Sequence, residues 1–164
     1  MNKVICVCYG KGGHQEQMKR LLRLFEEDGR NSISVVVITD SDSVPNVNFT
    51  VLEIIKVPEF RDKNSNIRTL LGLVPSVLRL CVNAVKVKFK YNPRLFITTG
   101  PGLAIIPAYV FKLFNVKIVA FESWSRFSRK SFTGRFLYLI SGVFFVQNKK
   151  LLSSYKNAVY KGTL

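Results

Sequence analysis

Short apolar runs that end at glycine or at polar residues recur along this chain, and helical periodicity follows most of them. Each run has four to seven residues and is rich in β-branched side chains, as buried strands are. We predict strands at residues 4–9, 33–38, 49–55, 95–98, 117–121 and 143–146. Because the runs are apolar almost throughout, both faces of the sheet should be covered. The pattern predicts an α/β fold with a Rossmann-like, doubly wound parallel sheet.

Helical stripes lie between these runs. Met18, Leu21, Leu22 and Phe25 recur at the spacing of an amphipathic helix. Further helices are predicted over 66–89, with a break or kink near Gly72 and Pro75, and over 103–114. In a last helix, Phe132, Phe136, Leu139 and Ile140 share one face, and the tail is predicted as a short helix and an extended end. At 164 residues, the chain is predicted to form a single domain over 1–164.

The charge balance points to an anionic partner. The chain has 25 basic and 10 acidic residues, and its net charge is +15. Nucleic acid, an anionic membrane and a phosphate-bearing substrate all fit this charge. Cys6, Cys8 and Cys81 are predicted to be reduced core residues, and the single histidine disfavours a zinc site. No stretch reaches the ~18 uncharged apolar residues that span a bilayer, so membrane contact is expected to be peripheral.

Three loops follow predicted strands, at the edge where parallel sheets bind ligands. They are Gly10–His14, Thr98–Gly102 and Glu122–Arg126. The glycines allow close approach of a ligand, although tight turns explain them equally well. His14 opens a helix and can relay protons near neutral pH. Glu122 is either an acid/base group or a salt-bridged cap.

Basic residues concentrate in two segments. Arg79, Lys86 and Lys90 share one face of the helix predicted to end near Phe89, with Asn83 between them. This face suits an anionic bilayer surface, or it is an ordinary solvated face. A second basic run, from Arg126 to Arg135, lies on the last presumed ligand loop and suits phosphate binding.

These motifs together resemble a known family. Gly12-Gly13-His14, with Gln17 nearby, resembles the acceptor domain of MurG-like GT-B glycosyltransferases. The motifs of the second half resemble the PssD/CpsF/EpsE-type polysaccharide biosynthesis proteins, bacterial relatives of the membrane-anchor subunit of the eukaryotic dolichol-pathway GlcNAc transferase. Those motifs are Thr99-Gly100-Pro101-Gly102, Phe121-Glu122-Ser123 with Arg126, Ser131 to Gly134, Leu137-Tyr138 and Phe145-Val146-Gln147.

The resemblance implies a division of labour. The chain would be the acceptor-side, membrane-associated half of a two-component glycosyltransferase, with a separate subunit that binds a UDP-sugar. The implied acceptor is a polyprenyl-diphosphate-linked saccharide in capsule, exopolysaccharide or O-antigen synthesis, at the cytoplasmic face of the bacterial inner membrane. We expect no cofactor and no metal.

The resemblance also assigns site residues. Inverting transfer needs a base, for which His14 and Glu122 are the candidates, with Glu122 in either a catalytic or an orienting role. The candidate substrate-binding residues are Gly12, Gly13, Gln17, Thr99, Gly100, Pro101, Gly102, Ser123 and Arg126. The candidate membrane-binding residues are Arg79, Lys86 and Lys90.

Three alternatives stay open at this point. The first is a non-catalytic scaffold or enhancer of a partner glycosyltransferase. Its charge also fits a nucleic-acid-binding protein, although aromatic and basic residues do not interleave as they do in known modules. A dinucleotide-dependent enzyme is disfavoured because the glycine fingerprint is missing and Asp40 is the only candidate for the ribose carboxylate.

Overall fold

The computed structural model describes residues 3–28, 33–42, 48–58 and 66–164, with the backbone alone for residues 66–73. In these residues the sheet has seven strands, all parallel, in the order β3-β2-β1-β4-β5-β6-β7. The strands are β1 (Lys3–Tyr9), β2 (Ile33–Thr39), β3 (Thr50–Lys56), β4 (Leu95–Thr98), β5 (Lys117–Phe121), β6 (Val143–Val146) and β7 (Val159–Tyr160). The six predicted strands and their parallel arrangement are therefore confirmed, and β7 forms from part of the predicted extended end.

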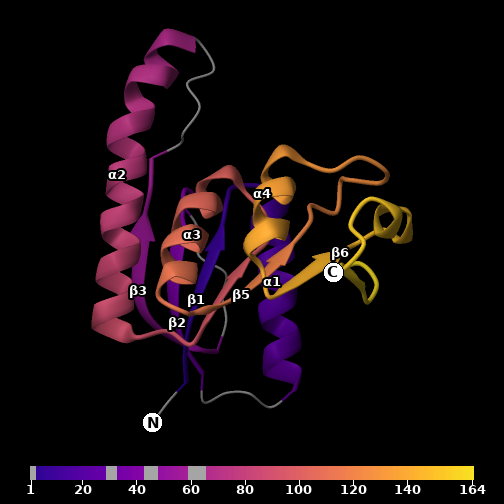
Figure 1. Cartoon of the computed structure of the whole chain (residues 1–164). Helices are drawn as coiled ribbons and strands as arrows, with labels where there is room; N and C mark the ends of the chain where they lie inside the picture. The colour runs from indigo at the N-terminus through magenta and orange to yellow at the C-terminus, as the bar shows by residue number, and fades with distance from the viewer. Residues whose placement is uncertain (1–2, 29–32, 43–47, 59–65) are drawn as a thin grey trace.

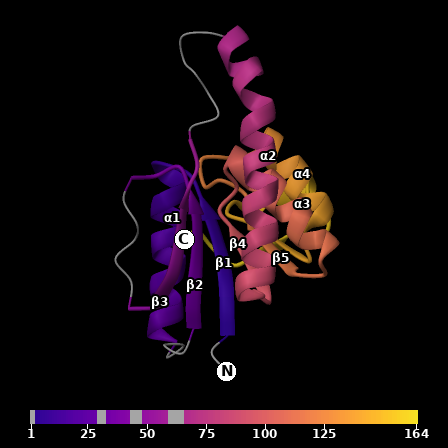
Figure 2. The ribbon, with the colours of Figure 1, turned by 90° about the vertical axis from the view of Figure 1, so that its left-hand side faces the viewer.

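Helices cover both faces of the sheet. They are α1 (Gly13–Glu27), α2 (Asn66–Tyr91), α3 (Ile105–Leu113) and α4 (Phe132–Ile140), with 3-10 turns at Gly102–Ala104 and Lys149–Ser153. Figure 2 shows α1 on one side of the sheet and the layer of α2, α3 and α4 on the other. This is the predicted doubly wound α/β fold.

Side chains along β1 point alternately to the two faces of the sheet, and each face has its own hydrophobic core. Ile5, Val7 and Tyr9 pack with α1, whereas Cys6 and Cys8 belong to the core beneath α2, α3 and α4. The two cysteines thus point to the same face and are buried and free, as predicted. Cys81 is also free, but it is only half-buried, so its assignment to the core is wrong.

Helix α2 runs through Pro75 without a break (Figure 1). The proline removes one backbone donor. The turns after it bury Leu80, Ala84 and Val87 against the sheet, and this packing sustains the helix. A break at Pro75 is therefore wrong, whereas the alternative prediction of a kink near Gly72 and Pro75 stays a prediction. Among the described residues, no helix combines the length and apolarity needed to cross a bilayer.

The predicted apolar face of α4 is divided in the structure. Ile140 is buried, as are Gly134 and Leu137. Phe132 and Leu139, by contrast, are 73% and 75% exposed. Helix α4 therefore has apolar side chains on both its inner and its outer face.

Candidate functional site

The carboxyl ends of the central strands carry the three predicted loops. We define the first loop as residues 10–13, after β1, the second loop as residues 99–102, after β4, and the third loop as residues 122–131, after β5. A Cβ added to Gly10 would lie 3.1 Å from Cβ of Pro101, and one added to Gly13 would lie 3.0 Å from Nε1 of Trp124. The first loop thus contacts both of the others, so the structure brings together loops that are far apart in the sequence.

Glycine is required at position 100 because of the backbone conformation there and the close packing around it. Its φ is +87°, and an added Cβ would lie 2.7 Å from the carbonyl oxygen of Phe121. Only glycine fits such a position without strain. This close approach fixes the second loop against the start of the third.

His14 lies at the meeting point of the first and second loops. Its Nδ1 is 2.6 Å from the carbonyl oxygen of Thr99, and Oγ1 of Thr99 donates to the carbonyl of His14 over 2.9 Å. Because a carbonyl oxygen only accepts, Nδ1 carries the hydrogen, and the neutral ring then has a lone pair on Nε2. Burial lowers the pKa of His14, against the opposing effect of the Thr99 hydrogen bond. The ring is thus a neutral imidazole near pH 7, the form that accepts a proton.

Glu122 is held by four donors. Its carboxylate, which is 1% exposed, accepts from the amides of Ser123 and Ser131 at 3.0 and 3.2 Å and from the Ser131 hydroxyl at 2.6 Å. The fourth donor is the Tyr155 hydroxyl, at 2.5 Å. These donors are hydroxyls and amides rather than an arginine. The arrangement favours the orienting role over the acid/base role, because every donor ties Glu122 to the protein.

Gly134 packs directly on this carboxylate. An added Cβ would lie 2.3 Å from Oε2 of Glu122 and 2.7 Å from the Tyr155 hydroxyl. The Ser131 hydroxyl also accepts from the Gly134 amide at 2.8 Å and so caps α4. The sequence does not predict the contact of Tyr155 with Glu122, because no local pattern links two residues 33 positions apart.

The other predicted binding residues differ in their exposure to solvent. Gly12, Gly13, Gly102 and Arg126 are exposed at the loops, and Ser123 is half-buried. Thr99, Gly100 and Pro101 are buried and serve the packing between the loops. Gln17 is fully buried, and within the described residues its amide has no hydrogen-bond partner. A substrate does not reach Gln17 in this conformation, so direct binding by its side chain is not supported.

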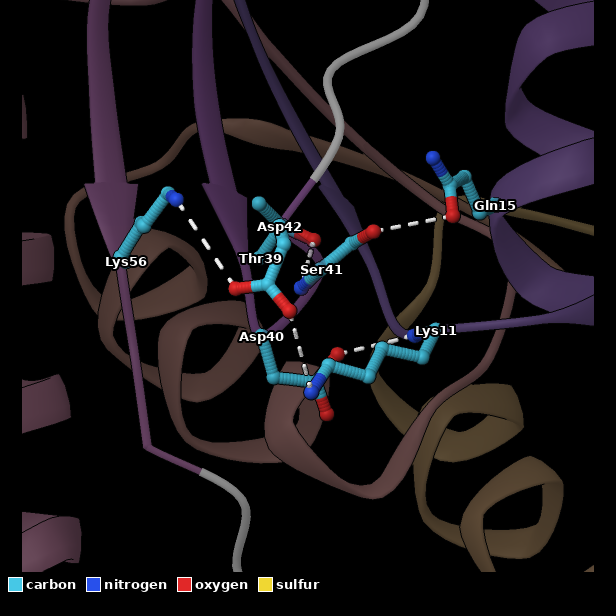
Figure 3. Close-up of polar contacts among 7 residues, drawn as sticks. All are labelled: Lys11, Gln15, Thr39, Asp40, Ser41, Asp42 and Lys56. Atoms are coloured by element: carbon cyan, nitrogen blue, oxygen red, sulfur yellow. Dashed lines mark hydrogen bonds and ion pairs between the residues drawn. The ribbon is translucent and has the colours of Figure 1, made fainter.

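Polar residues at the carboxyl ends of β2 and β3 lie beside the first loop and the start of α1 (Figure 3). Oδ1 of Asp40 accepts from the Lys11 amide at 2.8 Å, and the Ser41 hydroxyl donates to Gln15 at 2.9 Å. Asp42 lies 3.6 Å from Nζ of Lys11 and 3.9 Å from Nζ of Lys56. The Asp40 carboxylate therefore binds the backbone of the first loop. This contact further disfavours the interpretation of Asp40 as a ribose-binding carboxylate.

The basic residues predicted to bind a membrane lie on α2. Arg79, Lys86 and Lys90 are exposed along this helix, whose N-terminal part extends beyond the loop edge of the sheet (Figure 1). Lys90 also pairs with Glu53 of β3 at 3.0 Å, and Tyr91 donates to the same carboxylate at 2.7 Å. Of the three residues, Lys90 is thus tied to β3 by an ion pair.

Solved structures define the class of fold. MurG from Acinetobacter baumannii superposes on 100% of this chain with a TM-score of 0.65 and 11% identity, and the chain spans 44% of MurG. The UDP-GlcNAc 2-epimerase of Methanocaldococcus jannaschii superposes on 98% with a TM-score of 0.67 and 12% identity, over 46% of its length. At these identities the likeness concerns the fold. The chain has the Rossmann-like fold of the N-terminal half of a GT-B protein.

Sequence comparison then defines the family. The profile described as "Oligosaccharide biosynthesis protein Alg14 like" matches residues 5–164. UDP-N-acetylglucosamine transferase subunit ALG14 of Kluyveromyces lactis is 30% identical, over 99% of this chain and 79% of that protein. The human protein of the same name is 24% identical, over 98% and 82%. The chain belongs to the Alg14-like family. The predicted relationship to the eukaryotic transferase subunit is confirmed, whereas the PssD/CpsF/EpsE assignment stays a prediction.

Proposed function

We propose that this chain is the acceptor-side subunit of a two-component glycosyltransferase that moves a sugar from a UDP-sugar to a polyprenyl-diphosphate-linked saccharide. One observation carries the proposal: almost the whole chain aligns with proteins named as transferase subunits. Its fold is also similar to one half of MurG. A separate subunit would supply the other half and the nucleotide-sugar site. The names of the relatives favour N-acetylglucosamine as the sugar.

In this proposal His14 is the base. Nε2 takes the proton of the acceptor hydroxyl as that oxygen forms its bond to the anomeric carbon and UDP leaves with the bonding electrons. The Thr99 carbonyl holds the ring in the tautomer that this step needs. Glu122 is a positioning residue that fixes the third loop beside the first.

The exposed part of the loops would receive the acceptor. Gly12 and Gly13 lie at the start of α1, where backbone amides attract an anionic group. Arg126 is exposed on the third loop and adds positive charge, with Ser123 beside it. These groups suit the diphosphate of the acceptor. Thr99, Gly100 and Pro101 shape this surface from beneath, and Gly102 lies at its exposed end.

The basic face of α2 supports peripheral binding to a membrane. Arg79 and Lys86 project from a helix that also exposes Val82 and Phe89. Lys90 contributes less than predicted, because Glu53 offsets its charge. The setting in capsule, exopolysaccharide or O-antigen synthesis at the bacterial inner membrane stays a prediction, since the two ALG14 proteins compared above are fungal and human.

Variants in the complex of this chain with its donor-binding partner test the assignment. His14→Gln is expected to lower kcat roughly 100-fold or more with unchanged stability, the usual effect of losing a general base. Glu122→Gln is expected to lower stability and activity together. Arg23→Ala, an exposed change on α1, serves as the matched control. Near-parental turnover by His14→Gln would remove the base assignment and leave the scaffold alternative.

A further inference from the structure

The outer surface of the α2–α3–α4 layer combines exposed apolar side chains with an almost complete lack of acidic residues. Residues 63–142 contain 13 lysines and arginines and a single acidic residue, Glu122, which is buried. In contrast, Glu16, Glu26, Glu27 and Asp28 lie in or directly after α1, on the opposite side of the sheet. The two sides of the molecule therefore differ in electrostatic character.

Helix α4 carries the most apolar part of this surface. Phe132, Phe136 and Leu139 form a stripe at i, i+4 and i+7, with exposed fractions of 73%, 36% and 75%. The rings of Phe132 and Phe136 pack edge to face, 5.0 Å apart. Phe127, on the third loop, is 65% exposed. Monomeric proteins rarely expose so many large apolar side chains together unless something binds them.

Exposed cations flank the stripe. Arg129 precedes α4 and Arg135 lies within it, and both are exposed. Lys130 lies between them in the chain order and stacks over the Tyr155 ring at 4.7 Å. Aromatic and leucine side chains flanked by basic ones are the signature of a surface that enters the headgroup region of an anionic bilayer.

We propose that the stripe of Phe132, Phe136 and Leu139, together with Phe127, inserts into an anionic lipid surface. The charge of this face favours lipid over a second copy of the chain. Two copies of the face would bring like charges together, whereas anionic headgroups complement Arg129 and Arg135. This contact is separate from the predicted one on α2, although both lie in one layer (Figure 2).

Insertion of this stripe would also set how the acceptor site faces the membrane. This part of the inference rests on the proposed function. The third loop carries both Phe127 and Trp124, and Trp124 lies against Gly13, next to His14. Insertion of Phe127 would place the loop edge of the sheet at the bilayer surface. An acceptor anchored by a polyprenyl chain would then present its diphosphate to the loops without leaving the membrane.

Vesicle flotation of the whole purified chain tests the proposal. With vesicles of phosphatidylglycerol and phosphatidylcholine, the double variants Phe132→Ser/Leu139→Ser and Arg129→Glu/Arg135→Glu are each expected to bind roughly tenfold or more weakly than the parent. Leu24→Ser/Arg23→Glu makes one exchange of each kind at exposed positions of α1 and should bind like the parent. Pure phosphatidylcholine should bind the parent weakly.

Three results would overturn the proposal. One is equal loss of binding in the α1 control, and another is parental binding by both α4 variants. The third is a dimeric parent that Phe132→Ser/Leu139→Ser makes monomeric with unchanged vesicle binding, which would show that a second copy covers the stripe. The proposed function is tested independently, because the partnered Phe132→Ser/Leu139→Ser variant should keep parental turnover on a water-soluble, short-chain acceptor.

Discussion

The Tyr155 hydroxyl donates a hydrogen bond to Oε2 of Glu122 across 33 positions of the chain, over 2.5 Å. Glu122 opens the third loop, and Tyr155 follows the last 3-10 turn. Burial, together with this hydrogen bond, raises the pKa of Tyr155 above its usual range, so the phenol keeps its proton and remains a donor. The bond thus ties the C-terminal segment to the loop that contacts the first loop and its histidine.

Tyr155→Phe is expected to lower the free energy of unfolding by about 1.5–3 kcal/mol, the usual cost of losing a hydrogen bond to a charged group. Urea titration of the parent and the variant measures this change. Tyr109→Phe removes a hydroxyl from a side chain that is 40% exposed and should change stability by less than ~0.5 kcal/mol. Similar effects of the two substitutions would contradict the role given to the Glu122 contact.

Gly134→Ala is expected to destabilise the protein by at least ~2 kcal/mol, because the new methyl group would overlap Oε2 of Glu122. Gly102→Ala is the matched control, since an added Cβ there has no neighbour within 4 Å among the described residues. Its effect should stay within ~0.5 kcal/mol of the parent. Thermal unfolding of both variants measures the contrast, and an unchanged melting temperature for Gly134→Ala would refute the packing at Glu122.

The lowered pKa of His14 predicts the pH dependence of stability. Above the ordinary pKa of 6.5, the ring is neutral in the folded and the unfolded chain, and it adds no pH dependence. As the pH falls below 6.5, the unfolded chain takes up the proton first, so the folded state loses stability until the folded pKa is reached. Urea titrations at pH 7.5 and 5.5 should show a larger loss for the parent than for His14→Gln. A larger loss for the variant would mean that the folded state favours the charged ring.

Much of the fold follows from local pattern. Runs such as Val4–Tyr9 and Ile33–Ile38 are apolar almost throughout, and in a sequence with helical stripes between the runs this indicates a covered parallel sheet. The seventh strand, Val159–Tyr160, has two residues and no pattern of its own, and it forms because β6 offers it an edge. Pro75 predicts a break that tertiary packing overrides.

The site is predictable in outline only. Parallel strands bring their carboxyl ends to one edge, so the sequence predicts that His14, Thr99 and Glu122 lie near one another. The sequence does not show that the Thr99 carbonyl selects the histidine tautomer. It also does not show that Glu122 is saturated by partners such as Tyr155, because both contacts join residues that only the folded chain brings together.

The most direct test of the central claim is a transferase assay with UDP-N-acetylglucosamine and a polyprenyl-diphosphate-linked acceptor in vesicles. It compares this chain alone, its donor-binding partner alone, and the two together. We predict product only when both chains are present. Full activity of the partner alone would contradict the claim that this chain forms the acceptor side of the enzyme.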